Sequence, residues 1–278
     1  MWVEDRDAGP GDEPDAAPTR DDAGRADRDE RRADRRQLRA AASAGRPAAT
    51  TTDSAAAGAA AAGGGESHRR TVPRPVVDEL EHQAGAQRGG RLAGRLAEAA
   101  HAYERDRYQE ARRILRPLAE ELPESASVQE LYGLTLYRMG QWALAARHLE
   151  IYRHRSGEYD QHPVLADCYR ALRRYADAEA LWDDLREASP SAELVAEGRI
   201  VEAGCKADQG DLRGAITTLE RAARRVDHPA DHHLRQWYVL ADLYERAGDV
   251  PRARDLFARV AAADADAFDV RSRLRALR

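Results

Sequence analysis

Apolar residues recur with helical spacing near the end of the chain. Between Trp237 and Phe257 they are three and four positions apart, which is the pattern of two short amphipathic helices. Gly248 lies between the two apolar runs and predicts the turn that joins the helices. Small residues, Ala241 in the first run and Ala253 in the second, would let the two helices pack closely. The stretch therefore predicts an α-helical hairpin.

The same pattern recurs upstream at intervals of 34, 33, 37 and 38 residues. Each predicted hairpin carries an alanine in its second helix, which we call the marker alanine. A small residue lies twelve positions before each marker, and a large apolar residue lies four positions after it. Five units in phase predict an array of helical hairpins. The marker alanines are Ala111, Ala145, Ala178, Ala215 and Ala253, and the small residues are Ala99, Gly133, Ala166, Ala203 and Ala241.

This repeat resembles the tetratricopeptide repeat (TPR). The TPR pattern is Trp-x2-Leu-Gly-x2-Tyr, then Ala-x3-Phe, then Pro. Ala241 stands where the pattern has Gly, and Ala265 stands where it has Pro. The resemblance implies an all-α superhelix, a TPR solenoid of about five helix-turn-helix repeats. The matching residues in the last unit are Trp237, Leu240, Ala241, Tyr244, Ala253 and Phe257.

The chain is predicted to have four parts. Residues 1–70 hold 14 acidic and 12 basic residues with few large apolar ones, so they are expected to form a disordered, low-complexity tail. Residues 71–90 are expected to be a linker with a short helix. Five TPR repeats should occupy 91–265. A capping helix should occupy 266–278, because terminal repeats need a polar outer face.

Particular residues predict where helices begin and end. The Gly-Gly pair at 89–90 is expected to separate the linker from the array. Ser189 is expected to cap the first helix of repeat four, with Pro190 at its first position. The second helix of that repeat is expected to run from Asp211 to Val226, with Asp211 as its cap.

The resemblance also implies a binding site. TPR arrays usually bind peptides or helices in a concave groove lined by the first helix of each repeat. In this chain the groove positions carry mixed charges and tyrosines, which suits a partner with basic and aromatic groups. The expected groove residues are Tyr103, Glu130, Tyr137, Arg138, Asp167, Arg170, Arg235, Tyr238 and Asp242.

No motif in the sequence indicates an enzyme. A nucleophile elbow, a phosphate-binding glycine loop and a P-loop lysine are all missing from the sequence. His228, Asp231, His232 and His233 have a metal-like composition, but Pro229 interrupts their helical face and their spacing fits no zinc pattern. We expect no catalytic residue, no metal and no cofactor.

The two cysteines, Cys168 and Cys205, each lie ten residues before a marker alanine. Equivalent sites in stacked repeats are about 10 Å apart, the spacing of packed helices, whereas a disulfide needs Cα atoms within about 7 Å. Both are therefore expected to be small buried residues. A redox pair is the weaker alternative.

Charge and hydropathy limit which classes of partner and which cellular locations are expected. The net charge is −5 with 44 basic and 49 acidic residues, so no field of the whole molecule favours nucleic acid as a partner. The sequence contains no run of 18 apolar residues, so it predicts no membrane span. Its acidic N-terminus does not resemble a secretory signal. We expect a cytoplasmic protein; the sequence does not predict its oligomeric state.

Two functions are therefore compared. The first is a non-enzymatic TPR scaffold that binds a protein or peptide in its groove. The alternative is an RNA- or ribosome-associated factor that uses the Arg-rich tail and Arg221–Arg225. The last four repeats also resemble a group of uncharacterised actinobacterial TPR proteins, which implies lineage rather than activity. The phrases that carry this resemblance begin at His162, Arg199 and Phe257.

Overall fold

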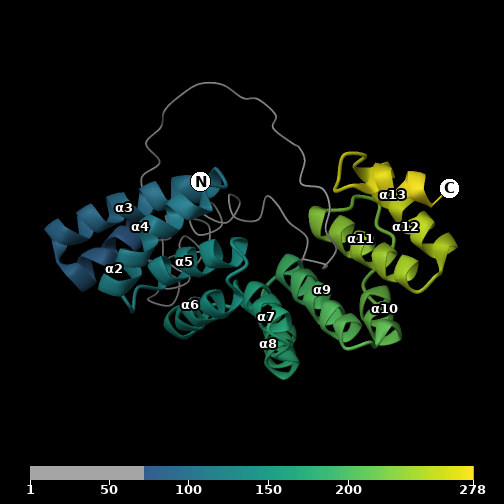
Figure 1. Ribbon diagram of the computed structural model, residues 1–278, viewed down its shortest axis with the longest axis horizontal. Helices are drawn as coiled ribbons and strands as arrows, with labels where there is room; N and C mark the ends of the chain where they lie inside the picture. Colours follow the sequence, from purple (N-terminus) through teal and green to yellow (C-terminus); the bar gives the residue numbers. More distant parts are fainter. Residues whose placement is uncertain (1–71, 278) are drawn as a thin grey trace, which may run out of the picture. The chain divides into compact units, whose positions relative to one another are not determined.

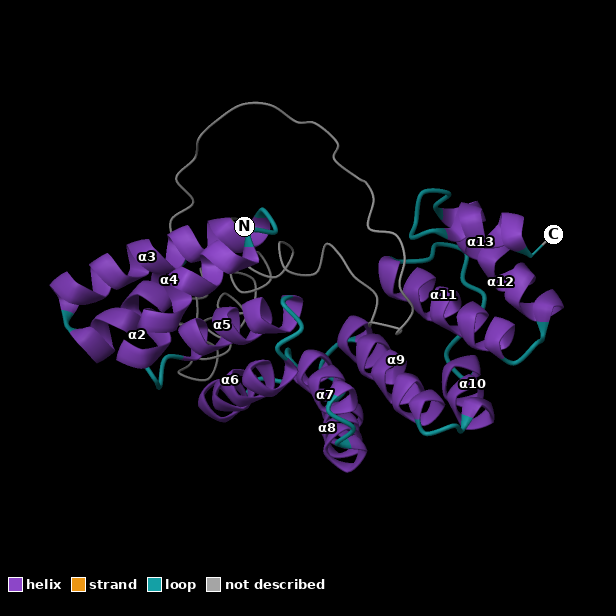
Figure 2. Ribbon diagram, in the orientation of Figure 1, coloured by secondary structure: helices purple, strands orange, loops and turns teal. Residues whose placement is uncertain are grey.

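The computed structural model describes residues 72–277, and within this range every regular element is an α-helix (Figure 1, Figure 2). The expected disordered tail, residues 1–70, lies outside the described residues. The helices are α2 (Arg74–Ala84), α3 (Ala86–Glu104), α4 (Tyr108–Glu121), α5 (Ala126–Arg138), α6 (Trp142–Ser156), α7 (His162–Ala171), α8 (Tyr175–Ala188), α9 (Ala192–Asp208), α10 (Leu212–Glu220), α11 (Asp231–Arg246), α12 (Val250–Ala263) and α13 (Val270–Ala276).

Consecutive helices pack as five hairpins, α3 with α4, α5 with α6, α7 with α8, α9 with α10, and α11 with α12. The second helix of each hairpin also packs against the first helix of the next one. The neighbouring helices follow one another through Figure 1 in chain order. The predicted all-α array of helical repeats is therefore confirmed.

Small residues bring the two helices of each hairpin together. All five marker alanines are buried, and so are the five small residues twelve positions before them. A Cβ atom at Gly133 would lie 2.7 Å from Cγ of Leu149, which is closer than real Cβ contacts allow. Leu149 lies four positions after its marker, so the small residue of one helix receives the large residue of the other. This contact is the physical reason for the sequence pattern.

The apolar core forms two clusters that meet at α9. Val201 and Cys205 of this helix belong to the cluster that extends back to α2. Ile200, Ala203 and Ala207 belong to the cluster that extends forward to α13. Both faces of α9 are therefore covered, and this 17-residue helix joins the two halves of the array.

Packed helices begin further upstream than the sequence predicted. Residues 71–90 were expected to be a linker with a short helix. α2 is such a helix, but it packs directly on α3, which begins at Ala86, and the Gly-Gly pair at 89–90 lies inside α3. Gly89 is where α3 crosses α2, because a Cβ atom there would lie 2.5 Å from Cα of Glu81. Leu80 of α2 is fully buried in the core. The glycine pair therefore serves a close helix contact rather than a break.

Repeat four also differs from prediction at its helix ends. Ser189 does not cap α9 but ends α8, in a left-handed conformation with φ of 41°. Ser191 is the actual cap of α9, and its hydroxyl accepts a hydrogen bond from the Leu194 amide at 3.2 Å. Asp211 caps α10 as predicted. That helix ends at Glu220, and the irregular chain after it still packs Val226 against the core.

The C-terminal helix is shorter than the predicted 266–278. It begins at Val270, because Phe268 adopts a left-handed conformation with φ of 54° that no helix accommodates. Val270 is buried, and Leu274 and Leu277 pack against the second core cluster. The segment therefore covers the end of that cluster, although only its last part is helical.

The glycine pair offers a matched test of the α2–α3 contact. Gly90 is exposed, and a Cβ atom there would meet nothing within 4 Å. Gly90→Ala should raise the free energy of unfolding by about 0.5–1 kcal/mol, because alanine favours helix over glycine. Gly89→Ala should lower it by about 1–3 kcal/mol through overpacking. Urea unfolding of both variants measures the difference, and equal effects would show that α2 does not pack against α3.

His148 on α6 is held neutral inside the second hairpin. The amide nitrogen of Gln129 donates to the carbonyl oxygens of Leu122 and Pro123, so its amide oxygen faces Nδ1 of His148. Nδ1 must then carry the proton and donate to that oxygen. Burial, and secondarily the charge of Arg147, lowers the pKa of His148 to about 4.

This pKa predicts a loss of stability in acid. The folded chain binds the His148 proton more weakly than the unfolded chain, so the stability from this group is complete above about pH 6.5 and falls towards pH 4. Between pH 7 and pH 4.5, the melting temperature of the His148→Gln variant should therefore fall less than that of the unmodified chain. The difference between the two falls should be about a few degrees. His154→Gln, an exposed change on the same helix, is the control. Identical pH profiles for the His148 variant and the unmodified chain would contradict the assignment.

Candidate functional site

All nine predicted groove residues lie on first helices, but their exposure differs. Tyr103, Glu130, Asp167 and Arg170 are buried. The other five are partly exposed, namely Tyr137, Arg138, Arg235, Tyr238 and Asp242. Only the second group can therefore offer much side-chain surface to a partner.

One polar network joins three successive first helices, α5, α7 and α9. The hydroxyl of Tyr137 donates to Oδ2 of Asp167 at 2.6 Å. The Arg170 guanidinium donates from Nη1 to Oδ1 of Asp167 at 2.8 Å and from Nε to Oδ2 of Asp208 at 2.7 Å. We call these four residues the α5–α7–α9 network. Sequence reasoning chose three of them for a groove, and the structure connects them across two repeat boundaries.

The electrostatics of this network follow from its burial. Burial alone would lower the pKa of Arg170, but Asp167 and Asp208 more than offset it, so the pKa is raised and the charge stays fixed. Burial and the Asp167 carboxylate raise the pKa of Tyr137 well above its usual value, which keeps the phenol protonated as a donor. Gly204 makes room for the guanidinium, because a Cβ atom there would lie 2.9 Å from Nη1 of Arg170.

Two more contacts link neighbouring units at the start of the array. Arg138 donates from Nη2 to Oδ1 of Asp106 at 3.2 Å, and its guanidinium lies 4.7 Å from the centre of the Tyr108 ring. Tyr103 packs edge-on against the same ring from the core side. One repeat further on, Gln161 donates from Nε2 to Oε1 of Glu130 at 2.9 Å.

A second set of contacts joins α9, α11 and α13. Arg235 of α11 pairs with Glu197 of α9 at 2.8 Å. Arg273 of α13 pairs through Nη2 with Asp242 at 2.7 Å and with Glu245 at 2.8 Å, both on α11. These contacts repeat the arrangement of the α5–α7–α9 network, since each one ties a first helix to the element that follows it in the stack.

Tyr238 is held between α11, α12 and the segment before α13. Its hydroxyl donates to Oδ1 of Asp269. Its ring meets Phe257 edge-on, with centroids 5.4 Å apart, and Phe268 with centroids 4.7 Å apart. Phe268 is also partly solvent-exposed. The rings of Tyr238 and Phe268 form the aromatic part of the candidate surface.

Sequence reasoning missed several partners of the predicted residues. Arg273 and Asp269 lie in the expected capping segment, where no groove position was counted. Gln161 occupies the position just before α7 and so falls outside the first helix itself. A signal was available for Arg273, because α13 follows α12 where another first helix would stand, and acidic residues of α11 would then lie within its reach.

The two cysteines of the described range, Cys168 and Cys205, are buried. Burial raises the pKa of both cysteine thiols, that of Cys205 to about 12, so neither is a thiolate near neutral pH. His232 and His233 stack with ring centroids 4.0 Å apart. Within residues 72–277, no three His, Cys, Asp or Glu side chains are placed to hold a metal ion. None of the helices in this range has both the length and the apolar character to span a membrane.

Comparison with known proteins identifies the architecture. No protein-family model matches the chain, and no curated protein sequence matches it. Among solved structures, a thermophilic TPR protein from Thermus thermophilus is similar, with a TM-score of 0.52 and 19% identity over 67% of this chain and 98% of that one. The fold is a TPR-like all-α solenoid. The resemblance to actinobacterial TPR proteins is not tested by these matches and stays a prediction.

The α5–α7–α9 network predicts a large effect of removing Arg170. Arg170→Ala leaves the buried Asp167 carboxylate without its cation, so the free energy of unfolding should fall by about 3–5 kcal/mol. Arg186→Ala removes an exposed pair with Asp183 and should change it by less than about 0.5 kcal/mol. Denaturant unfolding compares them. A small loss for Arg170→Ala would show that the network does not support the fold.

Proposed function

We propose that the chain is a non-enzymatic scaffold that binds a protein or peptide along the face formed by its first helices. The observation that carries this proposal is the continuity of that face. Polar side chains of successive first helices are connected from α5 to α13, so a partner lying across them would meet one ordered surface. The TPR-like fold supports the same function, since such folds commonly mediate protein interactions.

The five partly exposed groove residues are proposed as the contact surface. Tyr137, Tyr238 and the neighbouring Phe268 offer rings, and Arg138, Arg235 and Asp242 offer charged groups. Aromatic residues and arginines dominate binding energy at protein interfaces. Because hydrogen bonds within the chain already hold these side chains, little side-chain entropy would be lost when a partner binds.

The pairing of these charges within the chain also predicts how the affinity for a partner depends on salt concentration. Arg138 pairs with Asp106, Arg235 with Glu197, and Asp242 with Arg273. A surface whose charges are mutually neutralised should bind through ring contacts and hydrogen bonds. Its affinity should therefore fall only slightly as salt is raised.

The alternative partner is RNA or the ribosome, bound by the Arg-rich tail and Arg221–Arg225. Such binding neutralises phosphates and releases counterions, so its affinity would fall steeply with salt. The tail lies outside the described residues. The paired charges of the groove support a protein partner for that surface, and we place the scaffold in the cytoplasm as part of this proposal.

The test begins with the full chain as bait. Cross-linked partners are captured, identified and purified, and their affinity for the chain is measured by calorimetry. Tyr238→Ala and Arg235→Ala should each weaken binding by about 1–2 kcal/mol. Arg147→Ala and Arg254→Ala, exposed changes on second helices, should stay within about 0.5 kcal/mol.

Circular dichroism verifies that each variant is folded before its affinity is compared. The proposal fails if the second-helix changes abolish binding while the groove changes leave it intact. It also fails if the captured partner is RNA and its affinity falls steeply with salt, since that result would establish the alternative.

A further inference from the structure

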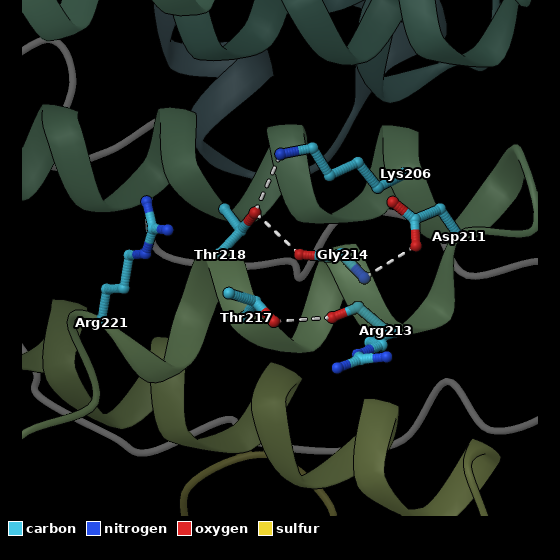
Figure 3. A pocket seen from close by; sticks show the side chains of 7 residues that line it. All are labelled: Lys206, Asp211, Arg213, Gly214, Thr217, Thr218 and Arg221. Atoms are coloured by element: carbon cyan, nitrogen blue, oxygen red, sulfur yellow. Dashed lines mark hydrogen bonds between the residues drawn. The ribbon is translucent and has the colours of Figure 1, made fainter.

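Repeat four contains an open pocket of about 350 Å³ at the end of α9 and along α10 (Figure 3). Lys206 and Thr218 lie on one side, Arg213 and Thr217 lie on the other, and Arg221 lies at the far end. None of these residues belongs to the first-helix face described above. The complete lining is Lys206, Asp211, Arg213, Gly214, Thr217, Thr218 and Arg221.

We propose that this pocket binds the phosphate group of a phosphorylated peptide. The proposal goes beyond the scaffold function and does not rest on it, because the pocket shares no residue with the groove. Three cationic side chains surround one hollow, some of their hydrogen-bond donors are free, and acidic groups lie beside them.

The pocket gathers more positive than negative charge, because three cationic side chains and one carboxylate, that of Asp211, line it. Arg213 and Arg221 line it, and neither forms an ion pair with another residue of the described range 72–277. Arg213 lies in the first turn of α10, and Arg221 directly follows the last residue of that helix, Glu220. Because both line the pocket, an anion inside it would be attracted by both guanidinium groups.

The donors that remain free also suit a phosphate. Lys206 has three N–H donors, of which one meets Oε1 of Glu202 at 2.9 Å and another Oγ1 of Thr218 at 3.0 Å, so one is left. The arginines each carry five N–H groups in a fork that fits two phosphate oxygens. The two threonine hydroxyls donate to backbone carbonyl oxygens, so the cations must supply the contacts.

Gly214 makes room for the Asp211 carboxylate at the edge of the pocket. A Cβ atom at this position would lie 2.0 Å from Oδ2 of Asp211, whose Oδ1 accepts a hydrogen bond from the Gly214 amide at 2.8 Å. Any side chain here would displace that carboxylate. A glycine inside a helix costs about 1 kcal/mol relative to alanine, and here it lets Asp211 cap α10 in this position.

The surroundings favour a peptide over RNA. Asp211 and Glu202 border the cations and would repel the continuous row of phosphates of a nucleic acid, whereas they tolerate a single phosphate group. Single-stranded RNA is usually held by aromatic rings on which bases stack, and no aromatic residue lines this pocket. Phosphorylated peptides are recognised by clusters of arginine, as found here.

The experiment uses the full chain, labelled with ¹⁵N, and follows the side-chain Nε–H signals of arginine by NMR. The probes are N-acetyl-O-phosphoserine amide, the same compound without phosphate, and a uridine decanucleotide. The phosphorylated compound should shift the signals of Arg213 and Arg221 to saturation and leave Arg254 unchanged. The compound without phosphate should leave all three unchanged.

Substitutions then assign the binding to the pocket. Arg213→Ala and Arg221→Ala should each weaken binding of the phosphorylated compound by about tenfold, the loss of one charge-assisted contact. Arg254→Ala, an exposed arginine on α12, should have no effect. None of the three side chains is buried, so the variants should remain folded.

The proposal is overturned if the phosphorylated compound leaves the Arg213 and Arg221 signals unshifted, or if Arg254→Ala weakens binding as much as the pocket variants. It is also overturned in favour of RNA if the decanucleotide binds more tightly than the phosphorylated compound and its binding depends on the same two arginines. A groove partner that binds normally to the Arg213→Ala variant would leave the scaffold function intact in either case.

Discussion

A single buried carboxylate, that of Asp167, connects three repeats of the solenoid. One of its oxygens accepts a hydrogen bond from Tyr137 of α5, and the other accepts one from Arg170. Arg170 also donates a hydrogen bond to Asp208 of α9. Apolar contacts along the array are made between neighbouring helices and would tolerate small changes of orientation. Directional hydrogen bonds between charged groups do not, because their strength depends on geometry. The network therefore determines how α5, α7 and α9 are placed relative to one another.

This constraint matters because α9 belongs to both core clusters. Its position relative to α7 is held by Arg170, and its position relative to α11 is held by the pair of Glu197 with Arg235. In a repeat array each unit contacts only its neighbours, so stability depends on every interface in turn. Polar residues of the first helices thus support the fold in addition to any binding they perform, and their loss would affect both.

The repeat pattern could be predicted from the sequence, because the spacing of Ala, Gly and large apolar residues directly reflects helix contact. Gly133 opposite Leu149 is a clear example. The role of the Gly-Gly pair at 89–90 could not be predicted, since the local sequence does not show that the α2 backbone passes 2.5 Å from where a Gly89 Cβ would lie. Helix ends at Ser189 and Phe268 depend on left-handed residues that local propensity disfavours. The predicted groove residues all lie on first helices, but their burial and pairing depend on side chains 30 to 38 residues away in sequence.

The central claim is that polar contacts between first helices join the repeats, and a double-mutant cycle across the α7–α9 boundary tests it most directly. Arg170→Ala, Asp208→Ala and the double variant are compared by denaturant unfolding, alongside the same cycle for Arg153 and Asp184, an inter-repeat pair that is more exposed. The account predicts a coupling free energy of about 1–3 kcal/mol for the first pair and less than about 0.5 kcal/mol for the second. A coupling between Arg170 and Asp208 no larger than that of the exposed pair would contradict it.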